Sequence, residues 1–200
     1  MKTRLDLHLH TRFSGDSTIS PKLVVEQLHA HPFIKAVAIT DHNTLQGYVE
    51  ARKLASSYQD ITIISGIEVS THHGDLIMLG VEEKPSYAST VWEVVDFAKA
   101  RAGAIVIPHP YRINGLGDLA EKIPADAIEI INPTATVREN KMAQELAKIR
   151  NLPGVSGSDA HAPLQMWTAY TEVVAGPDID EILKAIKKGQ VKPILADAII

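Results

Sequence analysis

The chain of 200 residues contains no cysteine. It therefore has no disulfide bond, no thiolate nucleophile and no zinc site that depends on sulfur ligands. A metal ion bound by this protein must be held by nitrogen and oxygen atoms. The sequence supplies such donors in its 9 histidines and 24 acidic residues.

Long apolar runs and runs of basic residues are also lacking. Residues 1–6 contain no apolar signal segment, and no apolar run approaches the roughly 20 residues needed to cross a bilayer. We therefore expect a cytoplasmic protein that does not enter a membrane. The net charge of -4 argues against a protein that binds nucleic acid through bulk positive charge.

The composition favours one compact domain over residues 1–200. Apolar residues make up 45% of the chain and charged residues 22%, so the chain can bury a substantial core. No linker, repeat or low-complexity tract divides the sequence, and its length suits a single domain.

Strand-like and helix-like segments alternate along the chain. Short apolar runs predict strands at residues 5–9, 36–40, 61–67, 76–81, 105–107, 127–131, 155–156 and 170–174. Capping residues Ser20, Asn43, Thr90, Thr136 and Asp178 predict helices over 22–31, 44–58, 91–101, 137–150 and 179–188. This order predicts an α/β fold with a mostly parallel sheet wrapped by helices, either as a closed barrel or as an open sheet.

Three segments depart from the alternation. Too few residues separate 61–67 from 76–81 for a crossover helix, so these strands are expected to form a hairpin or bent pair. Residues 108–119, rich in proline and glycine, predict a long loop with a short helix. The apolar tail, residues 193–200, is expected either to complete a barrel or to pack on a second subunit of a homo-oligomer.

The first strand carries two histidines that can chelate one metal ion. Strict alternation places Asp6, His8 and His10 on one face and three leucines on the other. The two histidine Cα atoms would lie roughly 6.5 Å apart. A strand end with two solvated histidines is the alternative to a metal site.

Four further strands run directly into side chains of the kind that bind metals. These residues are Asp41 and His42, Glu68, His109, and Asp159 with His161. Each could instead cap a helix, bind a loop carbonyl or lie at the surface. Because the carboxyl ends of parallel strands share one rim, however, we expect the side chains to converge. Histidine and carboxylate together suit zinc, manganese or iron, which can supply a nucleophilic hydroxide at neutral pH.

These motifs resemble those of the PHP (polymerase and histidinol phosphatase) superfamily. The similarity rests on Asp-Leu-His-Leu-His at 6–10, Thr-Asp-His at 40–42, Gly-Ile-Glu at 66–68, His-Pro at 109–110 and Ser-Asp-Ala-His at 158–161. The resemblance implies a distorted (β/α)7 barrel with two or three divalent metal ions at the C-terminal ends of the strands. It also implies phosphoester hydrolysis by a metal-bridging hydroxide, as in the small stand-alone metal-dependent phosphoesterases.

The resemblance further implies which side chains hold each ion. The three sets are His8, His10, Glu68 and Asp159; Glu68, as a bridge, and His109; and Asp16, His42 and His161. Asp41 would orient a ligand or shuttle a proton in catalysis.

One position departs from the family pattern. The family usually supplies a further histidine on or just before the strand after the glutamate, where this chain has Asp75. We expect Asp75 to replace that ligand. The alternatives are that His72 or His73 reaches in from the loop, or that the second ion is weakly held.

A phosphate substrate requires positive charge beyond the metal ions. Arg112 and Arg12 are the best-placed guanidinium groups, because their forked donors match phosphate oxygens. Each could instead form a surface salt bridge. Asn132, at the end of the strand 127–131, is expected either to face the rim and contact substrate or a ligand, or to act as a cap or turn residue.

The sequence thus predicts a metal-dependent phosphoesterase that acts on a phosphate mono- or diester. The expected substrates are a small phosphorylated metabolite, a nucleotide or the end of an oligonucleotide. A metal-dependent amidohydrolase on a similar barrel is one alternative. A non-catalytic PHP-like scaffold or RNA-binding subunit is the other.

Overall fold

The computed structural model describes residues 1–85 and 90–196. Within them, nine strands form one sheet: β1 (Thr3–Leu9), β2 (Ala36–Ile39), β3 (Thr62–Thr71), β4 (Gly74–Leu79), β5 (Ala104–Ile107), β6 (Ala127–Ile131), β7 (Gly154–Ser156), β8 (Ala169–Val173) and β9 (Val191–Leu195). The helices are α1 (Pro21–Ala30), α2 (Gln46–Ala55), α3 (Val91–Lys99), α4 (Val137–Arg150) and α5 (Ile179–Lys187). Short 3-10 helices are η1 (Arg12–Ser14), η2 (Gly117–Glu121) and η3 (Pro163–Gln165).

The strands follow the order β7-β6-β5-β4-β3-β2-β1-β8-β9 across the sheet. β1, β2 and β3 are parallel to one another, as are β5, β6 and β7. The pairs β3–β4, β4–β5, β1–β8 and β8–β9 are antiparallel. The prediction of a mostly parallel sheet is therefore wrong: half of the pairings are antiparallel, because β3 and β4 form the expected hairpin and β8 turns back beside β1.

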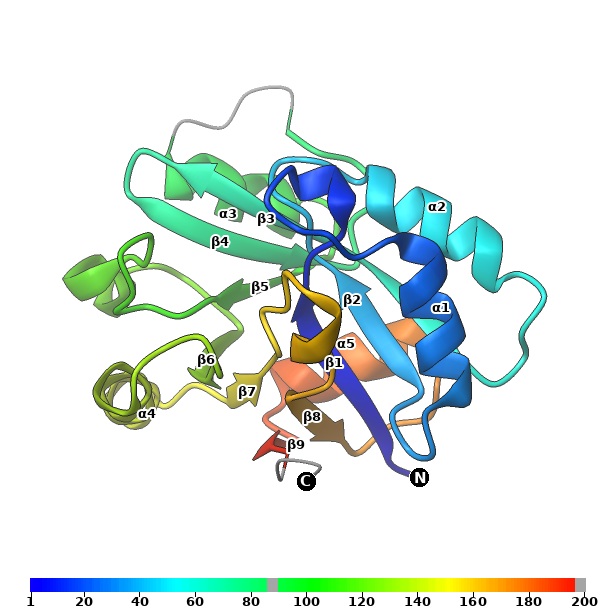
Figure 1. Ribbon diagram of the computed structural model, residues 1–200. Helices are drawn as coiled ribbons and strands as arrows, with labels where there is room; N and C mark the ends of the chain where they lie inside the picture. The colour runs from blue at the N-terminus through cyan, green and yellow to red at the C-terminus, as the bar shows by residue number, and fades with distance from the viewer. Residues whose placement is uncertain (86–89, 197–200) are drawn as a thin grey trace.

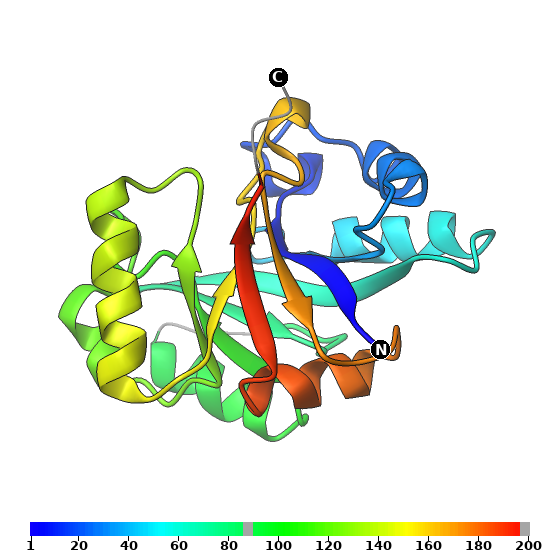
Figure 2. The same cartoon turned by 90° about the horizontal axis from the view of Figure 1, so that it is seen from below.

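The sheet curls until its two ends meet. Ser156 at the end of β7 contacts β8, where its backbone N donates to Thr171 Oγ1 at 2.8 Å and its Oγ donates to the Tyr170 carbonyl at 2.5 Å. Figure 2 shows β9 between β7 and β8 at this seam. Side-chain hydrogen bonds thus join β7 to β8 where the backbone ladder is interrupted. This confirms the distorted barrel that the family resemblance implies.

Apolar residues fill the barrel and cover it from outside. Leu5, Leu7 and the small or branched residues of neighbouring strands form an interior cluster, against which Ile182 and Ile186 of α5 pack. Helices α1 and α2 lie together on one side of the barrel, with α4 on the opposite side (Figure 1). The helices leave the carboxyl ends of β1, β2, β3 and β5 free to carry polar side chains.

Four of the five predicted helix caps are confirmed. The side chains of Ser20, Thr90, Thr136 and Asp178 each accept a hydrogen bond from the backbone N three residues later. The fifth cap is wrong: α2 begins at Gln46, and Asn43 has a φ of 56°, which an N-cap does not adopt. The Asn43 side chain instead accepts from the backbone N of Ser70.

The C-terminal apolar segment extends the sheet. Val191–Leu195 forms β9 on β8, so this part of the predicted tail completes the barrel, while residues 197–200 lie outside the described ranges. The predicted short helix near residues 108–119 is η2. None of the helices within the described ranges is both long and apolar enough to cross a membrane.

Candidate metal centre

A bulge in β1 aims both histidines of the first strand at one point. Leu5 and Leu7 pack in the barrel interior, whereas Leu9 packs under α1 and α2, and the register with β2 shifts between Asp6 and Leu9. Strict alternation is thus interrupted, and His8 follows the inward Leu7 directly. The Nε2 atoms of His8 and His10 lie 3.0 Å apart, and both rings are fully buried.

Two buried carboxylates lie against this histidine pair. Glu68 Oε2 is 3.3 Å from His8 Nε2 and 3.1 Å from His10 Nε2. Asp159 Oδ1 is 3.4 Å from each of the same two nitrogens. These are the four residues predicted for the first ion, and the structure brings all of them together.

The other oxygen of Glu68 points to a second group of donors. Glu68 Oε1 lies 3.0 Å from Nε2 of His109, which follows β5. One carboxylate therefore faces the His8–His10 pair on one side and His109 on the other, as expected for a residue that bridges two cations.

A third group lies at the solvent side of the centre. Asp16 Oδ2 is 3.4 Å from Nε2 of both His42 and His161, as predicted for these three residues. Asp16 is 53% exposed, in contrast to the buried His8 and His10. Donor atoms that lie within 4.8 Å of one another form three sets: His8, His10 and Asp159; His8, Glu68 and His109; and His10, His42 and His161.

The Nδ1 hydrogen bonds of three histidines turn their Nε2 atoms toward the donor sets. His8 Nδ1 donates to Glu129 Oε1 at 3.1 Å, because a carboxylate can only accept. Ser14 Oγ donates to Asp41 and therefore accepts from His10 Nδ1 at 3.0 Å. His161 Nδ1 donates to the backbone carbonyl of Asp159. Three rings thus present Nε2 acceptors toward shared space.

Two facing lone pairs 3.0 Å apart repel each other unless a proton or a cation lies between them or close by. The Nδ1 atoms of His42 and His109 are buried and have no hydrogen-bond partner within the described ranges. Neutral imidazole and carboxylate donors of this kind suit divalent zinc, manganese or iron. The residues present therefore fit the divalent cations that the sequence predicts.

The charges of the centre are strongly coupled. Burial lowers the pKa of His10, but hydrogen bonds to Asp159 and Glu68 outweigh burial and raise it to about 9. Burial raises the pKa of Glu68 and of Asp159, but the neighbouring histidines outweigh it and hold both values well below the usual range. Without a cation, protons on the histidines therefore balance the two carboxylates.

Asp75 lies close to the centre but belongs to none of the three donor sets found in the described ranges. It is buried opposite Ser70 and shares one face of the β3–β4 hairpin with Glu68. Burial and the Glu68 carboxylate raise its pKa. His72 and His73 are exposed in the hairpin turn. That any of the three completes the second site stays a prediction.

The two predicted arginines lie in different places. Arg112 Nη1 donates to Asp159 Oδ2 at 2.5 Å, and the side chain is 32% exposed, so it lies at the centre with part of its guanidinium open. Arg12 points outward, where its Nη2 donates to both oxygens of Glu50 at 3.0 and 3.2 Å. Arg12 therefore forms a surface salt bridge, which was the alternative to phosphate binding.

Asp41 is fully buried, and its position beside Thr11 and Ser14 places it next to the centre. Its oxygens accept from the backbone and hydroxyl of Thr11 and from Ser14, which in turn accepts from His10. Gly47 of α2 makes room for it, since a Cβ there would lie 1.9 Å from Asp41 Oδ2. This geometry suits a residue that orients His10 through Ser14.

Glu129, in the middle of β6, is a site residue that the sequence reasoning missed. Besides the bond from His8, its Oε2 accepts from the backbone N of His109 and from Asn132 Nδ2, both at 2.9 Å. Asn132 also donates to Asp159 Oδ2 at 3.1 Å. An acidic residue inside the apolar run 127–131 was the available signal, because a buried carboxylate requires partners.

The backbone is strained at two of the donors. His109 has a φ of 24° and Asp159 a φ of 51°, values that non-glycine residues seldom adopt and that cluster at functional sites. Gly157, just before Asp159, passes so close to β1 that a Cβ would lie 2.4 Å from that of His8. Close contact between these segments therefore fixes Asp159 against the histidine pair.

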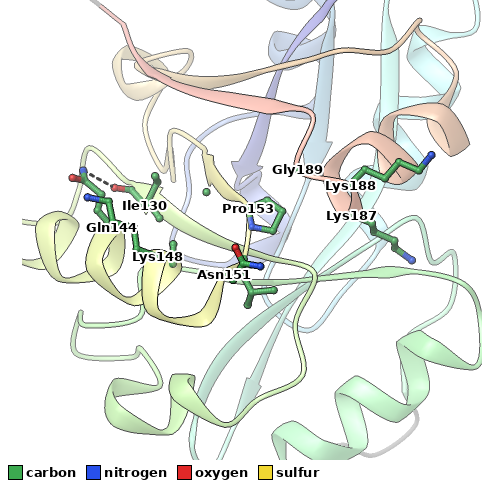
Figure 3. Close-up of a pocket in the computed structure, with 11 residues that line it drawn as sticks. Ile130, Gln144, Lys148, Asn151, Pro153, Lys187, Lys188 and Gly189 are labelled. Carbon is green, nitrogen blue, oxygen red and sulfur yellow. Dashed lines mark hydrogen bonds between the residues drawn. The ribbon is translucent and has the colours of Figure 1, made fainter.

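A separate pocket of about 670 Å³ lies away from these donors, where α4 and α5 end (Figure 3). Lys148, Lys187 and Lys188 line it, and Lys187 Nζ donates to the carbonyls of Ala102 and Gly103. Lysines near the last turns of helices offset the partial negative charge of the free carbonyls. These contacts account for the lysines without a ligand.

Comparison with known proteins identifies the family and the fold. The PHP domain family matches residues 6–154, and a family described as PHP-associated matches residues 137–191. Uncharacterized protein MJ1587 of Methanocaldococcus jannaschii is 31% identical over 141 residues, which cover 64% of this chain and 81% of that protein.

Two solved structures share the barrel. The lesion-specific endonuclease PfuEndoQ of Pyrococcus furiosus has a TM-score of 0.70 at 16% identity, covering 96% of this chain and 58% of that chain. A Bifidobacterium adolescentis protein, assigned as a metal-dependent phosphoesterase, has a TM-score of 0.62 at 18% identity, covering 78% and 87%. The match to the PHP domain spans most of the chain and includes the donors from His8 to His109, while Asp159 and His161 lie in the PHP-associated match. The chain therefore belongs to the PHP domain family.

Proposed function

We propose that the protein hydrolyses phosphoesters, with two or three divalent cations held by the three donor sets. The observation that carries this proposal is the arrangement of Glu68 and Asp159 between the histidine groups. The Arg112 guanidinium contacts the Asp159 carboxylate. When bound, such cations polarise phosphoryl oxygens and lower the pKa of water. A small phosphorylated metabolite, a nucleotide or an oligonucleotide end would satisfy this chemistry.

The side chains around the centre would divide the remaining work. Arg112 is held by Asp159 through one nitrogen and has further N–H groups open to bind phosphoryl oxygens. Glu129 and Ser14 hold the rings of His8 and His10 so that each Nε2 faces the centre. Asp41, which accepts from Ser14, would supply or accept a proton near His10.

Hydrolysis of an amide or another C–N bond is the second candidate, because similar donor sets serve that reaction as well. None of the strands that the sequence predicts runs directly into a lysine that could form a carbamylated bridge. This favours the phosphoester reaction. A non-catalytic scaffold remains the third reading and predicts that purified protein retains no metal.

The first experiment is elemental analysis of the purified chain after reconstitution with zinc, manganese or iron and desalting. Two or three ions per chain are expected, followed by release of phosphate, and not of ammonia or an amine, in a substrate screen. His8→Ala and Asp159→Ala should lose most of the metal and nearly all turnover while keeping the helical circular dichroism signal.

His29→Ala is the matched control, because His29 lies on α1, half exposed and paired with Asp60, away from the donor sets. It should behave like the unchanged protein. Full turnover by either ligand variant at matched metal content would overturn the site, and metal-dependent amide hydrolysis without phosphate release would replace the proposed reaction.

A further inference from the structure

A groove of about 570 Å³ runs along α2 beside η1. Phe13, Leu45 and Val49 form its apolar surface, and Glu50, Lys53 and Lys84 supply its charged groups. Volumes of this order suit a small organic group. None of these side chains belongs to the three donor sets.

Two residues that line the groove lie close in the chain to the open side of the metal centre: Phe13 precedes Ser14, and Thr44 lies two residues after His42. Ser14, next to Phe13, accepts from the backbone N of His42 and from His10 Nδ1, both at 3.0 Å. The open side of the centre is formed by Asp16 and His42, because His8, His10 and Glu68 are buried. A substrate that reaches the donors from solvent therefore passes Asp16 and His42, beside the segments that line this groove.

Arg12, which the sequence predicts to bind phosphate, lies beside this groove and contacts two of its lining residues. Its guanidinium carbon lies 5.5 Å from the centroid of the Phe13 ring, and both oxygens of Glu50 accept from it. Arg12 thus holds the ring on η1 and the carboxylate on α2 together. The apolar wall is fixed before any ligand arrives, which lowers the entropy lost on binding.

The charge of the groove selects the class of ligand. Glu50 is neutralised by Arg12, so Lys53 and Lys84 leave the lining net positive. Lys84 Nζ donates to the backbone carbonyl of Asn43 at 3.2 Å, at the end of the groove nearest His42. Val49 is 61% exposed, an apolar side chain open to solvent beside two ammonium groups. An anionic ligand with an apolar ring complements this surface.

We propose that this groove binds the leaving group of the substrate and that the substrate is an anionic phosphoester whose leaving group carries an apolar ring. The inference rests on the proposed function, since it places the phosphoryl group at the donor sets. The ring would lie on Phe13, Leu45 and Val49. Lys53 and Lys84 would attract the anionic substrate as a whole.

The test compares the binding of benzylphosphonate and ethylphosphonate to the metal-loaded protein by isothermal titration calorimetry. Both carry the same phosphonate and neither is hydrolysed, so binding is measured separately from bond cleavage. Benzylphosphonate should bind about ten-fold more tightly, because only its ring reaches the groove. Equal dissociation constants for the two compounds would overturn the groove as the ring site.

Val49→Asn should reduce the preference for benzylphosphonate several-fold and leave the affinity for ethylphosphonate unchanged. Val137→Asn is the control, because Val137 is an exposed valine of α4 outside the groove. A preference for the benzyl compound that survives Val49→Asn would place the ring elsewhere and also overturn the proposal.

Esters that carry the benzyl or the ethyl group distinguish this inference from the proposed function. Benzyl and ethyl phosphate have alcohol leaving groups of similar acidity, so a higher kcat/KM for the benzyl ester reports binding and not intrinsic reactivity. If neither ester is cleaved while benzylphosphonate still binds preferentially, the phosphoester reaction fails and the groove stands.

Discussion

At the scale of single residues, the centre depends on side chains that hold the donors in place. Glu129 is the clearest case, since three N–H groups converge on its carboxylate, from His8, from the backbone of His109 and from Asn132. Such partners fix the tautomer and the direction of a histidine ligand. The donors were visible in the sequence as residues at strand ends. Among the supporting residues, Asp41 was predicted but Glu129 was not, because nothing in a linear pattern links residue 129 with residue 8.

Glu129→Gln should lower the affinity for divalent metal about 10- to 100-fold while the fold is kept. A glutamine has one acceptor oxygen and one NH2 group, so its NH2 would face one of the three N–H donors. Competition with a chromophoric chelator measures the affinity. Glu145→Gln, an exposed change on α4, is the control and should leave affinity unchanged. Unchanged affinity in Glu129→Gln would show that Glu129 does not position His8.

At the scale of elements, apolar runs predicted eight of the nine strands in the described ranges, and cap residues predicted the start of four helices. β9 was not predicted as a strand, since Lys192 and Pro193 interrupt its apolar pattern. Proline is tolerated there because β9 is the last strand of the sheet. The sequence pattern also did not predict the bulge in β1, because alternation of residue types does not reveal where a strand shifts register.

The pairing of β1 with β8 is reinforced by charge. Lys2 Nζ donates to Glu172 Oε1 at 2.5 Å and Arg4 Nε to Glu172 Oε2 at 3.2 Å. These contacts, led by the Lys2 hydrogen bond, lower the pKa of Glu172 below its usual 4.5. A lowered pKa in the folded state adds stability that is present above pH 4.5 and is lost as the pH falls through the folded value.

Glu172→Gln should therefore destabilise the protein at pH 7 and have little effect at the most acidic pH at which the chain still folds. Urea unfolding of metal-free protein at a series of pH values measures the difference. Glu26→Gln, on α1, is the matched control, because Glu26 forms an exposed pair with Lys22 at 3.7 Å. A destabilisation by Glu172→Gln that does not vary with pH would contradict the electrostatic origin.

At the scale of the whole molecule, the centre joins segments that lie far apart in the chain. Its donors come from β1, from the segments after β2, β5 and β7, and from β3. An unfolded chain cannot present them together, so a cation binds the folded state far better. A ligand at 100 times its dissociation constant adds about 2.7 kcal/mol of stability.

Metal-loaded protein should accordingly melt about 5–10 °C above protein stripped with a chelator, given the usual scaling for a domain of this size. Differential scanning calorimetry of both forms makes the comparison. Asp159→Ala should show almost no difference between the two conditions. Identical melting temperatures for the two forms of the unchanged protein would mean that the donor sets do not bind metal in the folded state.

The position of β1 between β2 and β8 has a consequence for biosynthesis. His8 and His10 are translated well before Asp159 and His161. The backbone N of Asp159 donates to the carbonyl of His8. β1 therefore pairs with a segment that is translated later. A nascent chain therefore cannot assemble the full set of ligands, and metal acquisition is a late step in maturation.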